Sequence, residues 1–211
     1  MSDNRAKRTA MPAPRLKCAL LLIACAALAA DKDKATFQAK PVTEYPHRQT
    51  SEKVTIAAAT FITDEQTKEP FGKVNPWRFG VLPVLLVIQN DGKDAIKLDR
   101  LKFVYQLPDG SKVDATPSGD VKYLEGARKP GTVQDPLGGL HVKKGKNPLD
   151  EWEIEGRAFA AKVLPPGQSA SGFVYFQTPD TSDAASVYVS GLVNAASGNE
   201  LYYFEIPLSG K

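Results

Sequence analysis

The stretch Phe79-Gly-Val-Leu-Pro-Val-Leu-Leu-Val-Ile-Gln-Asn90 decides the fold of this chain. It is apolar almost throughout, Val and Ile dominate its second half, and it ends at the turn-forming residues Asn90-Asp-Gly92. A short apolar run bounded by turn residues predicts a strand that is buried on both faces. Pro83 has no amide hydrogen, so we expect the paired strand to begin at Val84 or to contain a bulge at Pro83.

Further short strands are expected on both sides of this stretch. The hydrophobic pattern shifts phase between Leu98 and Leu101, which predicts a bend near Asp99 and Arg100. The expected strands cover residues 53–63, 79–90, 95–107, 111–116, 169–178, 184–193 and 200–208. Strands at this spacing, without a β-α-β rhythm, predict an all-β fold: an antiparallel β-sandwich of about seven strands.

Residues 117–164 predict a long insertion of loop and short helix in this sandwich. We expect a short helix within 119–129 and a second within 149–164, where Trp152, Phe159 and Val163 would share one helical face. Residues 64–78 read as a polar connection that is anchored by Phe71 and Trp77.

The first 34 residues have the pattern of a secretory signal peptide. Residues 1–17 are polar and basic, residues 18–30 are almost wholly apolar, and charge returns at 31–34. The apolar run is shorter than the roughly 20 residues that a membrane-spanning helix needs. We therefore expect a signal peptide over 1–29, a flexible N-terminal arm over 30–52 and the sandwich domain over 53–211.

Two cleavage sites in this leader remain open. Ala27-Leu28-Ala29 fits ordinary signal peptidase and would release a free protein that begins near Ala30. Leu22-Ile-Ala24 followed by Cys25 resembles a bacterial lipobox, in which Cys25 becomes the lipidated first residue. The protein is thus expected in the periplasm or cell envelope, either free or held at the membrane by a lipid on Cys25.

The charge of the chain lies unevenly between its parts. Without the leader's five basic residues and one acidic residue, 22 basic and 23 acidic residues remain. A nearly neutral mature surface argues against nucleic acid as a partner, and it leaves a lipid anchor as the expected contact with a membrane.

Catalytic and metal chemistry find little support in the sequence. Both cysteines, Cys18 and Cys25, lie in the leader, so the mature domain has no disulfide or thiolate ligand. The two histidines, His47 and His141, lie in the polar arm and in a Gly- and Lys-rich loop. We expect no catalytic site, no metal site and no cofactor, and we predict that the protein is not an enzyme.

Three features of the domain are similar to a known family. They are the strand and turn at 84–92, the segment Leu164-Pro-Pro-Gly-Gln-Ser-Ala-Ser-Gly-Phe-Val-Tyr-Phe176, and the closing strand at 201–208. The pattern resembles the telokin-like immunoglobulin-fold domains of bacterial envelope lipoproteins. That resemblance implies an immunoglobulin-like sandwich in the envelope, and it carries over no catalytic residue because the family shares fold and placement rather than activity.

The expected function is that of an exported protein-interaction or structural module. Its partner is expected to be an envelope protein, and the long segment 117–150 is the best candidate for the contact because binding residues often lie on loops of a rigid scaffold. The candidate contact residues are His141, Lys143, Lys144, Lys146 and Trp152.

The alternative is a small-molecule or carbohydrate binder that uses an acidic and aromatic cluster at residues 150–155. Asp150, Glu151, Glu153 and Glu155 surround Trp152 there. The plainer interpretation of the same residues is an acidic first helical turn with Trp152 facing the core.

Overall fold

The computed structural model describes residues 37–124, 131–134, 140–143, 147–178 and 184–208. The chain divides into residues 1–34 and 35–211, and every described residue belongs to the second part. The expected signal peptide and Cys25 lie outside the described residues. No helix of the described part has the length and apolar character that crossing a membrane requires.

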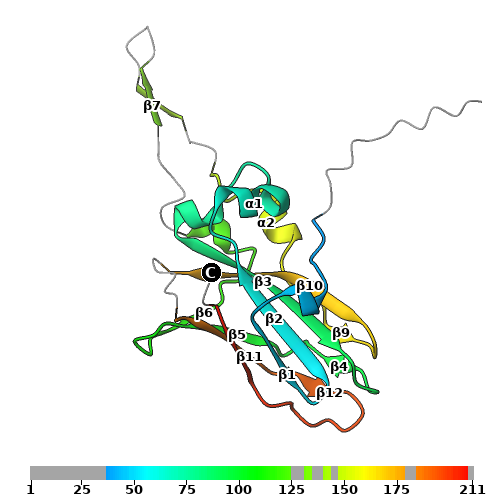
Figure 1. Ribbon diagram of the computed structural model, residues 1–211. Coiled ribbons are helices and arrows are strands. Elements are labelled where there is room, and N and C mark those ends of the chain that lie inside the picture. Colours follow the sequence, from blue (N-terminus) through cyan, green and yellow to red (C-terminus); the bar gives the residue numbers. More distant parts are fainter. Residues whose placement is uncertain (1–36, 125–130, 135–139, 144–146, 179–183, 209–211) are drawn as a thin grey trace, which may run out of the picture. The chain divides into compact units, whose positions relative to one another are not determined.

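Two four-stranded antiparallel sheets form the body of this part (Figure 1). The first sheet has the order β1 (Arg48–Ser51), β2 (Val54–Thr60), β3 (Val81–Asn90) and β10 (Ser169–Gln177). The second has the order β13 (Phe204–Pro207), β11 (Ser186–Ser190), β5 (Lys102–Gln106) and β6 (Lys112–Asp114). Side chains of both sheets share one buried cluster, the inner core, so the predicted all-β sandwich is confirmed.

Two smaller ladders complete the described strands. One joins β12 (Val193–Asn194), β4 (Ile96–Lys97) and β9 (Val163–Leu164). The other pairs β7 (Gly131–Gln134) with β8 (Leu140–Lys143). The bend expected near Asp99 separates β4 from β5, and a hairpin joins β5 to β6.

Strand β3 is buried on both faces, as its sequence predicts. Leu82, Val84, Leu86 and Ile88 point into the inner core between the two sheets. The alternate residues Val81, Leu85 and Val87 point to the opposite face of the first sheet, into a second cluster that we call the outer core. Alternate side chains of this one strand therefore pack in two different cores.

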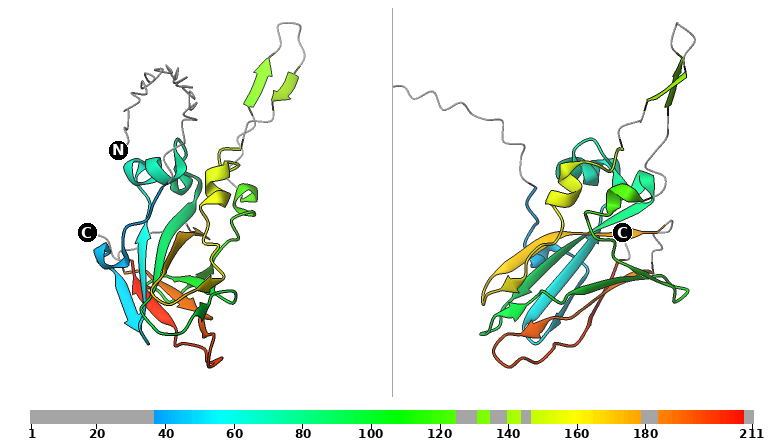
Figure 2. Two further views of the ribbon diagram at one scale, coloured as in Figure 1. Left: turned by 90° about the vertical axis from the view of Figure 1, so that its right-hand side faces the viewer. Right: turned by 180° about the vertical axis from the view of Figure 1, so that it is seen from behind.

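Helices cover the outer core. They are η1 (Val42–Glu44), α1 (Asp64–Phe71), η2 (Pro76–Phe79), η3 (Val121–Tyr123) and α2 (Trp152–Gly156). Figure 2 shows α1 and α2 gathered at one end of the first sheet, where the two helices are in contact. Val42, Phe71, Val121 and Ile154 are the side chains that these helices bury in the outer core.

Helix α1 occupies the segment that we predicted as a polar connection, so that prediction is wrong for residues 64–71. Thr63 and Gln66 form a capping box: the Gln66 amide donates to the Thr63 hydroxyl, and the Gln66 side chain accepts from the Thr63 amide. The predicted anchor Phe71 is buried at 2% exposure, whereas Trp77 is half-buried against the inner core. The spacing Thr63-x-x-Gln66 is the capping-box pattern in the sequence that indicates the start of this helix.

Strand β1 lies inside the segment expected as a flexible arm. Arg48–Ser51 pairs antiparallel with β2, and the Thr50 and Thr55 hydroxyl groups are 2.9 Å apart in a hydrogen bond. The strand is an edge strand with two exposed and two half-buried side chains, so it shows no apolar pattern. The ordered domain thus begins earlier than the predicted residue 53.

The expectation for Pro83 is also wrong, because β3 continues through it. In a strand the N–H and C=O of one residue point to the same side, and the Pro83 carbonyl accepts from Phe61 N at 3.0 Å, just past the end of β2. The side of Pro83 that lacks an N–H donor therefore faces the end of β2. Its pairing with Tyr175 of β10 stays in register.

The buried Tyr175 ties the first sheet to α2 and predicts a response of stability to high pH. Its hydroxyl donates to the Ile154 carbonyl at 2.6 Å. Burial raises the pKa of Tyr175 above its ordinary value of 10.0, and the nearby Arg157 charge offsets only part of this. The neutral phenol is favoured in the folded state, so its contribution to stability is full below pH 10 and is lost as the pH rises above it.

We therefore expect the free energy of unfolding to fall above pH 10 by at most about 1.4 kcal/mol per pH unit for this residue. The measurement is urea unfolding between pH 8 and pH 11 for the wild type and for Tyr175→Phe, which lacks the ionisable group. The wild type should lose stability more steeply than the variant. Parallel curves would contradict the prediction.

Candidate functional site

The exposed aromatic side chains of the helical layer mark the candidate site. Trp152 of α2 is 72% exposed, and Tyr123 of η3 is 67% exposed. The two helices are near each other, because Val121 of η3 and Ile154 of α2 belong to the same outer core and the Asn147 side-chain amide donates to the Lys122 carbonyl. We call Tyr123, Asp150, Trp152 and Glu155, which are all exposed, the helical surface.

Helix α2 turns Trp152 outward because Ile154 turns inward. Residues two apart on a helix point to nearly opposite sides. Ile154 is 1% exposed in the outer core, and its carbonyl accepts the Tyr175 hydroxyl. The interpretation of Trp152 as a core residue is therefore wrong. So is the single apolar face that we expected for Trp152, Phe159 and Val163, since α2 ends at Gly156 and Val163 is 54% exposed.

The acidic residues around Trp152 do form a helical first turn, as the plainer interpretation expected. Glu153 and Glu155 occupy that turn of α2, and Asp150 precedes the helix. Asp150 and Glu155 are exposed, whereas Glu151 and Glu153 are half-buried. Trp152 is thus an exposed indole in an acidic setting.

The other predicted contact residues are placed only in part. His141 and Lys143 belong to β8, which pairs with β7 in a hairpin. Lys144 and Lys146 lie outside the described residues. Within the part of the chain that is described, no three His, Cys, Asp or Glu side chains gather as metal ligands would.

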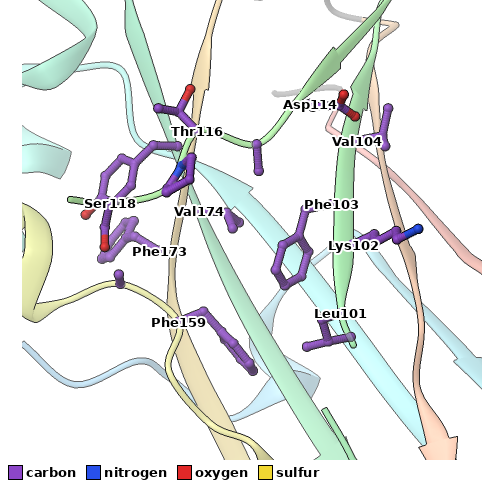
Figure 3. A pocket seen from close by; sticks show the side chains of 14 residues that line it. Leu101, Lys102, Phe103, Val104, Asp114, Thr116, Ser118, Phe159, Phe173 and Val174 are labelled. Atoms are coloured by element: carbon purple, nitrogen blue, oxygen red, sulfur yellow. The ribbon is translucent and has the colours of Figure 1, made fainter. Parts of the chain in front are cut away.

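A cavity of about 670 Å³ opens at one edge of the sandwich. Figure 3 shows Leu101, which precedes β5, and Phe103 of β5 pointing across it towards Phe159, and the Phe103 and Phe159 rings have centroids 6.1 Å apart. Thr116 and Ser118 lie at its other end, beside Phe173. Its size falls in the range of small-molecule sites.

Sequence reasoning missed this cavity, because its walls come from segments that are far apart in the chain. They are residues 101–104, 114–118, 158–159 and 173–175. Only the tertiary fold brings them together, and no local pattern marks them. The polar wall residues are Lys102, Asp114, Thr116, Ser118 and Tyr175.

A second group of aromatic residues consists of half-buried Tyr188 on β11 and the exposed Tyr202 and Tyr203, which directly precede β13. Tyr202 is 78% exposed and Tyr203 is 58% exposed, and the Tyr203 ring stacks near Tyr188 with 5.8 Å between centroids. A hydrogen bond from the Tyr188 hydroxyl to Glu205 raises the pKa of Tyr188, because it favours the protonated phenol. These tyrosines provide matched controls for the helical surface.

Comparison with known proteins assigns no family to the chain. No family model matches it, and no curated protein matches it. Among solved structures it is similar to a candidate lipoprotein, ycdA, of Bacillus subtilis at 12% identity and a TM-score of 0.38, over 78% of this chain and 39% of that one. The chain thus spans about two fifths of that protein's length.

Two further structures are similar at the same low level. One is a protein of unknown function from Listeria monocytogenes, with 14% identity, a TM-score of 0.34 and coverage of 78% of this chain and 82% of that one. The other is a DUF4426 family protein of Pseudomonas aeruginosa, with 8% identity, a TM-score of 0.30 and coverage of 78% and 95%. These similarities are too low to carry a functional conclusion.

Proposed function

We propose that this protein is an exported, non-enzymatic protein of the bacterial cell envelope, in which a telokin-like immunoglobulin-type sandwich acts as a protein-interaction module. It works free in the periplasm or anchored by a lipid on Cys25. The signal-peptide pattern of residues 1–29 supports export, and the sandwich of two antiparallel sheets supports the domain type. The partner is an envelope protein.

One observation carries the interaction: the 72% exposed Trp152 on α2. Tryptophan is enriched among the residues that dominate binding energy at protein interfaces. Ile154 and the Tyr175 hydroxyl fix α2 to the outer core, so the indole stands on an anchored element. Tyr123 of η3 is a second exposed aromatic residue of the helical layer.

The test is photo-crosslinking in intact cells from a photoreactive phenylalanine analogue placed at position 152. We expect one dominant envelope protein to be captured there. The same analogue at position 202, where Tyr202 is 78% exposed in the segment that precedes β13, should not capture it. Identical adducts from both positions, or none from position 152, would reject the helical surface as the contact.

Trp152→Ala provides the companion measurement of stability. Because the side chain is mostly exposed, the free energy of unfolding should change by no more than about 1 kcal/mol. Loss of partner capture by this variant would then report contact rather than unfolding.

A second candidate function, carbohydrate or small-molecule binding, is favoured by the same exposed indole in a segment that also exposes the carboxylates of Asp150 and Glu155. An exposed indole can stack on the apolar face of a sugar ring, while carboxylates accept hydrogen bonds from its hydroxyl groups.

Fluorescence titration tests this second function. The chain has two tryptophans, so Trp77→Phe leaves Trp152 as the only indole. Soluble cell-wall glycan fragments should then shift and saturate the emission of this variant. The reciprocal variant Trp152→Phe, which keeps Trp77, should not respond. Equal responses from both variants, or no response, would reject carbohydrate binding at Trp152.

A further inference from the structure

Gly156 lies directly beneath the indole of Trp152. A Cβ atom built on Gly156 would be 2.6 Å from Cζ2, 2.7 Å from Cε2 and 3.0 Å from Cη2 of Trp152. The six-membered ring therefore rests on the bare α-carbon one turn further along α2. A side chain at position 156 would occupy the space that the ring now fills.

Backbone conformation does not account for this glycine. Gly156 is absent from the glycines with positive φ in the described residues, so a residue with a side chain could adopt its backbone angles. Glycine also disfavours helix by comparison with alanine. The absence of a side chain at position 156 instead allows the Trp152 ring to lie against the backbone there.

This contact leaves Trp152 held on one face and free on the other. One face of the ring lies on Gly156, and yet 72% of the residue is exposed. A side chain that is already fixed in one orientation loses less conformational entropy when it binds.

We infer that Gly156 is a positioning residue that holds the Trp152 indole flat and sets the orientation of the binding surface. That this orientation is used for binding rests on the proposed function. The orientation of the ring itself can be measured without a partner. The Trp152 side chain is exposed and free to swing outward, so a methyl group at position 156 should displace the ring rather than unfold the domain.

The first experiment compares Gly156→Ala with Gly119→Ala, both in the Trp77→Phe background. Gly119 is the matched control, because its added Cβ would meet nothing closer than Glu155 Oε1 at 4.0 Å. In Gly156→Ala we expect loss of the near-ultraviolet circular dichroism of Trp152, stronger quenching by acrylamide and an unchanged melting temperature. Gly119→Ala should match its parent in all three measurements.

Two results would overturn the inference. Unchanged circular dichroism and quenching in Gly156→Ala would show that the ring keeps its orientation without the glycine. A large fall in melting temperature would show that Gly156 serves the fold itself.

A second experiment separates this inference from the proposed function. The photoreactive analogue is placed at exposed Asp150, so that Trp152 stays intact, and capture is compared between Gly156→Ala and Gly119→Ala. A loss of an interface contact worth about 1.4 kcal/mol lowers affinity roughly tenfold, and we expect a fall of that order only in Gly156→Ala. If the spectra change but no position of the helical surface captures a partner, the proposed function fails and the positioning role stands.

Discussion

Replacing Gly191 with alanine should destabilise the domain by about 3–5 kcal/mol, a large share of the stability of an ordinary domain. Gly191 follows β11 with a φ of +84°, in the region that disfavours side chains. An added Cβ would overlap the Arg100 carbonyl oxygen and lie 2.8 Å from its carbonyl carbon. Both are backbone atoms, so they cannot move aside as the far end of a side chain can.

Gly198→Ala is the matched control for this prediction. Gly198 has a φ of +74°, but an added Cβ would have no neighbour within 4 Å. It should cost only the backbone strain, about 1 kcal/mol. Urea unfolding of both variants measures the difference, and equal midpoints would show that the Arg100 backbone yields to the methyl group.

Leu85→Ala and Leu86→Ala should each cost about 2–5 kcal/mol, although the two residues are neighbours on β3. Leu85 is 1% exposed in the outer core, and Leu86 is 0% exposed in the inner core. A strand with one solvent-facing side would lose stability from only one of the two changes. The pair therefore tests whether both faces of β3 are packed.

Gln89→Ala on the same strand is the control, because Gln89 is half-buried and belongs to neither core. Its free energy of unfolding should change by less than about 1 kcal/mol. The measurement is again the urea midpoint. If either leucine variant behaved like Gln89→Ala, the layer on that face would be loosely packed and the two-core description would be wrong.

The prediction of the sheets was successful for strands whose own residues are apolar or alternate between apolar and polar. The apolar runs on β3 and β10 and the alternation of apolar and polar residues on β5 reflect the burial of each strand, so they can be seen in the sequence of that strand alone. Strand β1 was missed because it is an edge strand of polar, partly exposed residues, which show no apolar run or alternation. Strand β9 was missed because two residues are too few to show a period.

The candidate site could be predicted in identity but not in placement. The acidic cluster at 150–155 drew attention to Trp152, yet the spacing of Trp152, Phe159 and Val163 suggested that the indole faces the core. Helix α2 ends at Gly156, and it is Ile154 that the outer core accepts. Which side of a five-residue helix is buried depends on the sheet beneath it, and the sequence of the helix does not contain that information.

By itself, the sequence determined the class of fold, the two-sided burial of β3 and the positions of most strands, because these depend on the residues of each segment. The tertiary structure alone decided that Trp152 is exposed, that Gly156 lies beneath its ring and that residues 101–104 and 173–175 share a cavity. The cavity forms only when segments distant in the chain pack against one another. The exposure of Trp152 depends on which side of α2 packs on the sheet, and the ring then lies on Gly156 of the same helix.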